Sequence, residues 1–169
     1  MSIKDRLQTY KLSSLSGLIL LGLFCSSSLA FTGKVVGVSD GDTVTVLDHK
    51  TPVKVRLEGI DCPEKTQAFG SRAKLFTSKA CFGKTVEVKA KTRDRYGRTI
   101  GTVLLPGGTS LNQELVRNGL AWWYVHYAPR DKTLKNLESE ARAQRLGLWK
   151  DPSPLPPWDY RKNHRRRLR

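Results

Sequence analysis

Apolar and polar residues alternate with a period of two in five short segments of the chain. Turn-forming residues separate these segments, notably at 39–42, 51–52 and 94–98. Alternation bounded by turn signals is typical of β-strands, and the short turns between the first three segments predict an antiparallel meander. The five predicted strands cover residues 35–38, 43–47, 53–57, 85–90 and 101–105.

Apolar residues recur at helical spacing in three other segments. Gly83 ends the first predicted helix, Ser110 caps the second, and the third follows Pro129 and stops at Gly147. The apolar positions are Ala68, Phe69, Ala73, Phe76 and Ala80 in the first helix, Leu111, Leu115 and Val116 in the second, and Leu134, Leu137 and Ala141 in the third.

The order of these elements indicates a fold class. Five short strands, with a helix inserted between the third and the fourth, are typical of a small Greek-key barrel that carries its helices outside. The sequence therefore predicts an α+β fold, a five-stranded Greek-key barrel of the OB type with about three helices packed on it. We expect this domain to cover residues 31–150.

Residues 1–30 have the organisation of a signal peptide. Lys4, Arg6 and Lys11 precede an apolar stretch at 12–24, and small residues follow up to Ala30. The alternative is an uncleaved membrane anchor, but the apolar run is shorter than the roughly 20 residues of a spanning helix. We expect cleavage after Ala30 and export to the periplasm or the medium, without stable membrane association afterwards.

The chain is strongly basic. It has 30 Lys and Arg residues against 15 Asp and Glu residues, a formal net charge of +15. The predicted signal peptide contains three of the basic residues and one of the acidic ones, so +13 remains in the mature chain. Such an excess predicts a polyanionic partner, with nucleic acid favoured over an anionic membrane surface.

The C-terminal segment 151–169 is rich in proline and basic residues. This composition favours a solvated, partly disordered arm over an ordered binding element. Its positive charges would strengthen attraction to phosphate in a salt-dependent way. The basic residues are Arg161, Lys162, Arg165, Arg166, Arg167 and Arg169.

Two cysteines, Cys62 and Cys81, remain after removal of the predicted signal peptide. In an oxidising compartment an even pair predicts a disulfide. The alternative is two buried free thiols. A zinc site is disfavoured because the three histidines show no ligand spacing.

A small set of acidic residues and arginines has the inventory for phosphodiester hydrolysis. This reaction needs a carboxylate to orient or deprotonate water, and positive groups that stabilise the phosphorane charge. A hard cation such as Ca²⁺ would take oxygen ligands from nearby aspartates and a backbone carbonyl. Each motif alone could be a turn, a helix cap or a solvated strand face. The candidates are Asp42, Asp61, Glu64, Arg56 and Arg98.

Four ordered motifs resemble the staphylococcal-nuclease-like thermonucleases, over about residues 35–149. They are Asp40-Gly41-Asp42-Thr43-Val44, the segment from Arg56 to Glu64, Asp94-Arg95-Tyr96-Gly97-Arg98, and residues 111–121. The resemblance implies a barrel that hydrolyses DNA and RNA with Ca²⁺, with little sequence specificity, and leaves 3′-phosphate ends. The alternative is an OB module that binds nucleic acid without cutting it.

The resemblance also implies residue roles. Asp42 and Asp61 would ligate Ca²⁺ together with the backbone carbonyl of Cys62, and Asp40 would lie behind them. Glu64 would be the general base, and Arg56 and Arg98 would hold the scissile phosphate. Tyr96 would lie close to that phosphate, and Tyr127 is a candidate for contact with the base. These residues are Asp40, Asp42, Arg56, Asp61, Cys62, Glu64, Tyr96, Arg98 and Tyr127.

The chain departs from the family pattern at two places. The stretch 65–69 is shorter than the mobile loop of the staphylococcal enzyme, and Val125 stands where the family often has a tyrosine. The cysteines and the basic tail have no counterpart in the archetype. A monomer is expected.

Overall fold

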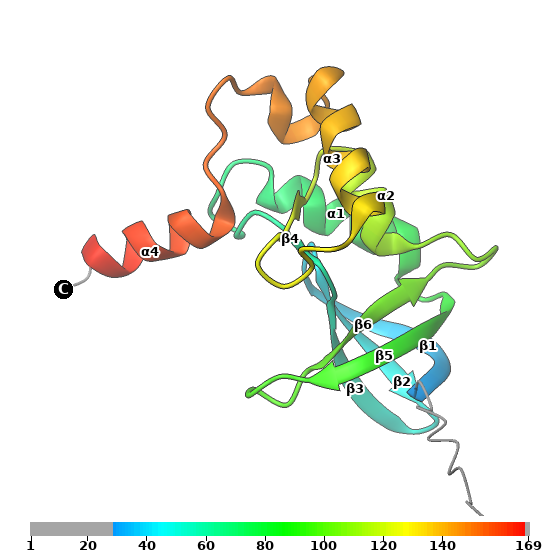
Figure 1. Cartoon of the computed structure of the whole chain (residues 1–169). Helices are drawn as coiled ribbons and strands as arrows, with labels where there is room; N and C mark the ends of the chain where they lie inside the picture. Colours follow the sequence, from blue (N-terminus) through cyan, green and yellow to red (C-terminus); the bar gives the residue numbers. More distant parts are fainter. Residues whose placement is uncertain (1–28, 168–169) are drawn as a thin grey trace, which may run out of the picture.

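Five strands close into a barrel in the computed structural model, which describes residues 29–167 (Figure 1). The strand order is β1-β2-β3-β6-β5, and β1 pairs with β5 to complete the closure. This confirms the predicted OB-type barrel. The strands are β1 (Leu29–Asp40), β2 (Thr43–Asp48), β3 (Thr51–Leu57), β5 (Thr85–Arg93) and β6 (Thr99–Leu104).

The first three strands form the antiparallel meander that the alternating pattern predicted. Val44 faces Val55 across the β2–β3 pair, and the valines on the inner side of the strands are fully buried. Strand β3 then pairs in parallel with β6, which places Arg56 opposite Ile100. Register shifts in β1 next to Gly37 bend this long strand around the barrel.

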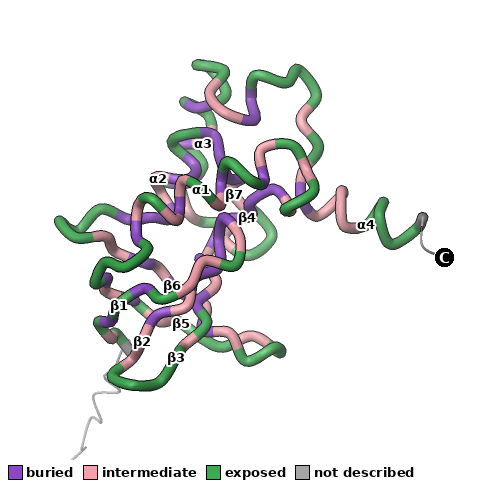
Figure 2. Tube along the Cα trace, turned by 180° about the vertical axis from the view of Figure 1, so that it is seen from behind, coloured by how far each residue is buried: buried purple, intermediate pink, exposed green. Residues whose placement is uncertain are grey.

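Helices cover one end of the barrel, and two of them begin at a polar capping residue. The side chain of Ser110 accepts a hydrogen bond from the amide of Gln113, and Asp131 does the same for Leu134. Buried residues concentrate where these helices meet the strands (Figure 2). The helices are α1 (Gly70–Cys81), α2 (Leu111–Arg117) and α3 (Lys132–Ala143), followed by the 3₁₀ turn η1 (Gly147–Lys150).

A two-stranded ladder outside the barrel is an element that the sequence pattern did not predict. Strand β4 (Ile60–Asp61) pairs with β7 (Trp122–Trp123), so that Asp61 faces Trp122. The ladder connects the end of β3 to the segment before α3. It therefore holds an acidic residue in a defined place beneath the helices.

The predicted signal peptide lies almost wholly outside the described residues. Its last two residues, Leu29 and Ala30, belong to β1, where they pair with Ala90 and Lys89 of β5. Within residues 29–167, no helix is long and apolar enough to cross a membrane.

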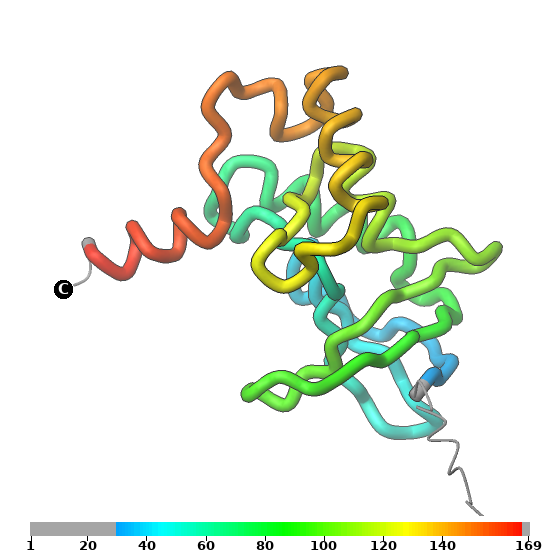
Figure 3. Tube along the Cα trace, viewed as in Figure 1, coloured from blue at the N-terminus to red at the C-terminus, as the bar shows by residue number. Residues whose placement is uncertain are grey.

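The basic tail is not the solvated arm that its composition predicted. Residues Pro157–Arg167 form a fourth helix, α4, which returns toward the barrel after an extended linker (Figures 1 and 3). The Trp158 ring stacks on Tyr124 with a centroid distance of 4.9 Å, and it meets Trp122 edge to face. Composition did not reveal this contact because it depends on aromatic residues more than thirty positions away.

The expected disulfide is also absent, since Cys62 and Cys81 are both free and buried. Cys62 lies beside Ala73, because both side chains flank the Cα of Gly41. Cys81 is eight residues farther along α1, about 12 Å along the helix axis. That separation exceeds the Cβ–Cβ distance of about 3.5–4.5 Å that a disulfide needs. The Cys81 thiol instead donates to the carbonyl oxygen of Thr77 at 3.1 Å.

Burial should make both thiols unreactive in the folded protein. Burial raises the pKa of Cys81 to about 11 and that of Cys62 well above its ordinary value. Ellman's reagent at pH 8 should therefore find almost no reactive thiol in the native mature chain, and two thiols after unfolding without reductant. No thiol after unfolding would mean that the two cysteines are linked.

Candidate active site

The turn between β1 and β2 is pressed against α1, and this contact places Asp42. A Cβ atom on Gly41 would lie 2.7 Å from Cβ of Ala73 and 2.8 Å from Sγ of Cys62, so only glycine fits. The hydroxyl of Thr77 donates to the carbonyl oxygen of Gly41 at 2.5 Å. These contacts direct Asp42 into the interior, where 5% of the residue is exposed.

The Asp42 carboxylate has two close partners on one of its oxygens. The amide of Cys62 donates to Oδ2 at 2.6 Å, and the Arg56 guanidinium lies 2.8 Å from the same oxygen. The Asp42 amide donates in turn to Oδ1 of Asp40 at 3.2 Å, so Asp40 contacts the backbone of Asp42. It is the amide of Cys62, rather than its carbonyl, that contacts Asp42 here.

Arg56 also contacts the second buried aspartate. Its Nη2 atom donates to Oδ1 of Asp61 at 2.7 Å, and its Nη1 atom donates to the carbonyl oxygen of Ile60 at 3.1 Å. Asp61 is 1% exposed, and the Arg56 side chain is 15% exposed. One guanidinium thus connects two carboxylates from separate elements, the β1–β2 turn and strand β4.

Glu64 lies at the edge of the same cluster. A Cβ atom on Gly70 would lie 1.9 Å from the carbonyl oxygen of Glu64, so the start of α1 approaches this backbone closely. The Glu64 amide donates to Oε1 of Gln67 at 3.1 Å. Its side chain is 39% exposed, which leaves the carboxylate at the boundary with solvent.

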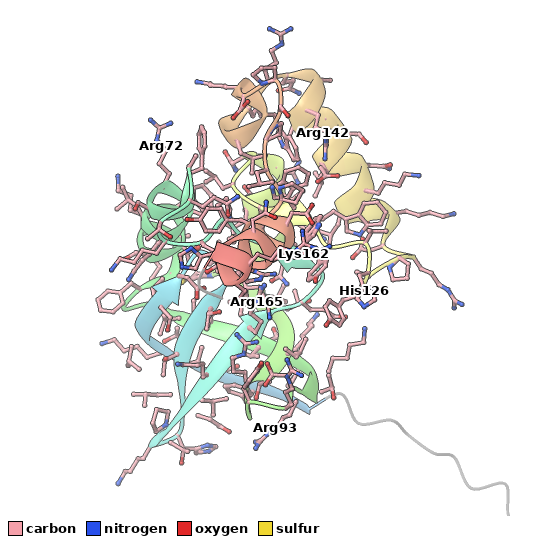
Figure 4. The ribbon with its side chains drawn as sticks, turned by 90° about the vertical axis from the view of Figure 1, so that its left-hand side faces the viewer. Arg72, Arg93, His126, Arg142, Lys162 and Arg165 are labelled. Atoms are coloured by element: carbon pink, nitrogen blue, oxygen red, sulfur yellow. The ribbon has the colours of Figure 1, made fainter. Side chains whose placement is uncertain are left out.

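A residue that the sequence analysis had assigned to the solvated tail, Arg161 of α4, completes the cluster. Its Nη2 atom donates to Oδ2 of Asp61 and its Nη1 atom to Oε1 of Glu64, both at 2.7 Å. Figure 4 looks onto α4 and shows Lys162 and Arg165 beside this position on the helix. No local signal in the sequence distinguishes Arg161 from its basic neighbours.

The buried charges shift one another's pKa values. Burial raises the pKa of Asp42 to about 7, against the opposing effect of Arg56. Burial would lower the pKa of Arg56, but Asp42 and Asp61 raise it more. For Arg161, Asp61 and Glu64 likewise outweigh burial and raise the pKa. Both arginines therefore stay charged at any physiological pH.

Arg98 and Tyr96 lie on the β5–β6 hairpin, outside the carboxylate cluster. Arg98 donates through Nε to Oδ2 of Asp94 at 2.7 Å, and its guanidinium lies 5.6 Å from the centre of the exposed Tyr96 ring. Burial would raise the pKa of Asp94, but hydrogen bonds from the Arg98 side chain and from the amides of Arg98 and Tyr96 together lower it. The β3–β6 register places Arg98 about two residues, roughly 7 Å, along the strand from the position opposite Arg56.

Two tyrosines of the aromatic segment before α3 differ in their surroundings. Tyr127 is exposed, whereas Tyr124 contacts both Tyr127 and Trp158 of α4. Tyr127 is 67% exposed and meets Tyr124 edge to face at 4.8 Å. Burial, followed by the charge of Asp61, raises the pKa of the Tyr124 hydroxyl, while Arg161 opposes the shift. Tyr124 thus lies nearer the cluster than the predicted Tyr127, and sequence reasoning missed it.

The donor set of the cluster fits a hard cation. Asp42 and Asp61 offer carboxylate oxygens that already converge on one positive group, Arg56. Oxygen ligands of this kind suit Ca²⁺ better than softer metals. Among residues 29–167 no group of three or more His, Cys, Asp or Glu side chains is arranged as a complete metal site. The protein would therefore supply only part of a coordination shell.

The barrel and its cluster define an OB-type domain with a buried carboxylate–arginine site, and comparison with known proteins identifies its family. The family described as "Staphylococcal nuclease homologue" matches residues 54–151. The chain is 45% identical over 141 residues to "Micrococcal nuclease" of Shigella flexneri, a match that covers 78% of this chain and 81% of that protein.

Two further relatives extend the comparison. Identity to "Uncharacterized endonuclease" of Escherichia coli O157:H7 is 46% over 129 residues, covering 76% of this chain and 84% of that protein. Identity to "Staphylococcal-like nuclease CAN1" of Arabidopsis thaliana is 40% over 112 residues, covering 66% and 34%. The chain belongs to the staphylococcal nuclease homologue family, which confirms the resemblance carried by its motifs.

Substitution of Arg56 by Gln should destabilise the fold by about 3–5 kcal/mol, because it leaves Asp42 and Asp61 buried without this cation. The loss should be largest above pH 7 and smaller near pH 5, since burial already raises the pKa of Asp42 to about 7 and protonation relieves the uncompensated charge. Urea unfolding at both pH values measures this difference.

The matched control is Arg98→Gln, which removes an arginine from the more exposed pair with Asp94. Its cost should stay below about 1 kcal/mol. Equal destabilisation by the two substitutions would contradict a structural role for the buried pair.

Proposed function

We propose that this protein is a nuclease that hydrolyses phosphodiester bonds of DNA and RNA with little sequence specificity. Family membership and the similarity to proteins named as nucleases support hydrolysis of nucleic acid. The observation that carries the proposal is a connected series of ion pairs, in which Arg56 joins Asp42 to Asp61 and Arg161 joins Asp61 to Glu64. A module that only bound phosphate would have no use for three carboxylates there.

Ca²⁺ is the proposed cofactor, with Asp42 and Asp61 as its carboxylate ligands and the carbonyl oxygen of Cys62 as a third. When bound, such an ion neutralises phosphate charge and promotes attack by water. Two carboxylates bind Ca²⁺ weakly, with a dissociation constant on the order of 10⁻⁴ M or higher, which suits a protein that works outside the cytoplasm.

The other side chains of the site have separate roles in the proposed reaction. Glu64, with its carboxylate at the solvent boundary, orients a water molecule and accepts its proton. Arg98, whose side chain is 30% exposed, turns from Asp94 to the scissile phosphate, where a planar guanidinium matches two oxygens. Arg56 keeps the two aspartates in place and adds positive charge beneath that phosphate. The exposed rings of Tyr96 and Tyr127 provide surfaces that stack on any base.

Replacing Glu64 with Gln should lower the rate of single-stranded DNA cleavage by about 10²–10⁴-fold, because the neutral amide cannot accept a proton. Glu114→Gln, on the surface of α2, serves as the matched control and should cleave at the wild-type rate. EDTA should stop cleavage by the wild type, and Ca²⁺ should restore it. Mass spectrometry of the fragments should find 3′-phosphate ends.

Two results would contradict these assignments. Cleavage that persists in EDTA would remove the metal from the reaction. Wild-type activity in Glu64→Gln would remove Glu64 from the role of base. Retention of DNA without any fragments would support the non-catalytic alternative.

We also propose that the protein is exported and processed after Ala30, on the basis of the charged, apolar and small-residue segments of the first thirty residues. Expression of the full chain in a Gram-negative host should give a periplasmic product whose N-terminal residue is Phe31. Intact-mass measurement tests this. A full-length product in the cytoplasm would contradict it.

A further inference from the structure

Arg161 occupies the place where a cation would meet the acidic cluster. Its guanidinium contacts both oxygens of Asp61, Oδ2 at 2.7 Å and Oδ1 at 3.3 Å, and it contacts Oε1 of Glu64 at 2.7 Å. Arg56 contacts Oδ1 of Asp61 from the other side. Both oxygens of this carboxylate are thus engaged by the protein's own arginines.

Contacts of the first half of helix α4, and of the linker before it, hold Arg161 in this position. Trp158 stacks on Tyr124, the Tyr160 hydroxyl lies 3.0 Å from that of Thr66, and Gln67 donates to the carbonyl oxygen of Leu155 at 2.6 Å. From Lys162 to Arg166 the helix is exposed and projects from the body of the molecule (Figure 1). The contacts that hold the helix are therefore these few and the ion pairs of Arg161.

A divalent cation and the Arg161 guanidinium would compete for Oδ2 of Asp61, the oxygen that Arg56 does not contact. The cation needs carboxylate lone pairs of Asp61, and two positive groups in contact with one carboxylate repel each other strongly where water is excluded. The Arg161 side chain is 36% exposed, so it has a path to solvent when it is displaced. Entry of the cation therefore requires Arg161 to leave.

We propose that Arg161 is an internal counter-cation, which competes with Ca²⁺ for Asp61, pairs with Glu64 in the ion's absence, and whose displacement undocks α4 from the site. This proposal rests on the proposed function, since it assumes a Ca²⁺ site that includes Asp61. It gives the basic tail a second role, in addition to attraction of nucleic acid. While α4 is docked, Arg161 stays paired with Asp61 and Glu64 until the ion binds.

Calorimetric titration of the full mature chain with Ca²⁺ tests the competition without reference to activity. Arg161→Gln should bind Ca²⁺ at least about fivefold more tightly than the wild type, because the competing charge is gone. The matched control is Arg165→Gln, which removes the same charge one turn farther along α4 on an exposed side chain. Its affinity should stay within about twofold of the wild type, since exposed charges are screened.

Two more measurements follow the helix itself. Trp158→Ala removes the stacking contact on Tyr124, away from the carboxylates, and should also tighten Ca²⁺ binding. In the wild type, hydrogen exchange of amides in residues 158–162 should become faster when Ca²⁺ saturates the protein. The exchange of amides in the barrel strands should stay unchanged.

The outcomes separate this inference from the proposed function. Equal or weaker Ca²⁺ binding by Arg161→Gln, with α4 equally protected before and after the ion binds, would overturn the competition and leave the Ca²⁺ site standing. Absence of Ca²⁺ binding in the wild type and in both variants would overturn the competition and the Ca²⁺ site together. A tightening as large in Arg165→Gln as in Arg161→Gln would reduce the effect to net charge and also overturn the competition.

Discussion

The ion pairs of Arg56 with Asp42 and Asp61 are the interaction on which the rest of the structure depends. Two carboxylates this deep in the protein would be costly without a positive partner, and Arg56 meets both within 2.8 Å. The three residues come from strand β3, the β1–β2 turn and strand β4. Their contact therefore fixes the position of the β4–β7 ladder relative to the barrel. The same contact brings the two aspartates of the candidate site together.

Neutralisation of buried acidic charge also explains the position of the C-terminal helix. Arg56 pairs with Asp42 and Asp61, whereas Asp61 and Glu64 accept from a second arginine, Arg161 of the tail. Aromatic contacts between Trp158 and Tyr124 fix the start of the helix, and the ion pairs of Arg161 follow one turn later. The tail thus contributes a positive charge to the acidic cluster.

Local pattern predicted the barrel because its strands are half-buried and its turns are short. Alternation in residues 43–47 and 53–57 indicated which side of each strand faces the core, and the predicted cap at Ser110 marked where a helix begins. The motifs also revealed Asp42, Arg56, Asp61 and Glu64 as candidates, and the fold brings these four together. Arg98 and Tyr96 are on the neighbouring hairpin, where a turn held by Asp94 keeps them apart from the acids.

The sequence by itself determined the family, the barrel and the acidic residues of the site, because these depend on periodicity and on short motifs. Only the tertiary structure decided what became of the tail and the cysteines. A basic, proline-rich segment has the composition of a solvated arm, yet Arg161 finds Asp61 one hundred residues away. Two cysteines in a chain predict a disulfide, yet Cys62 lies beside Ala73, about two turns of α1 away from Cys81. Both outcomes depend on distances in space between residues far apart in the chain, and no local pattern encodes them.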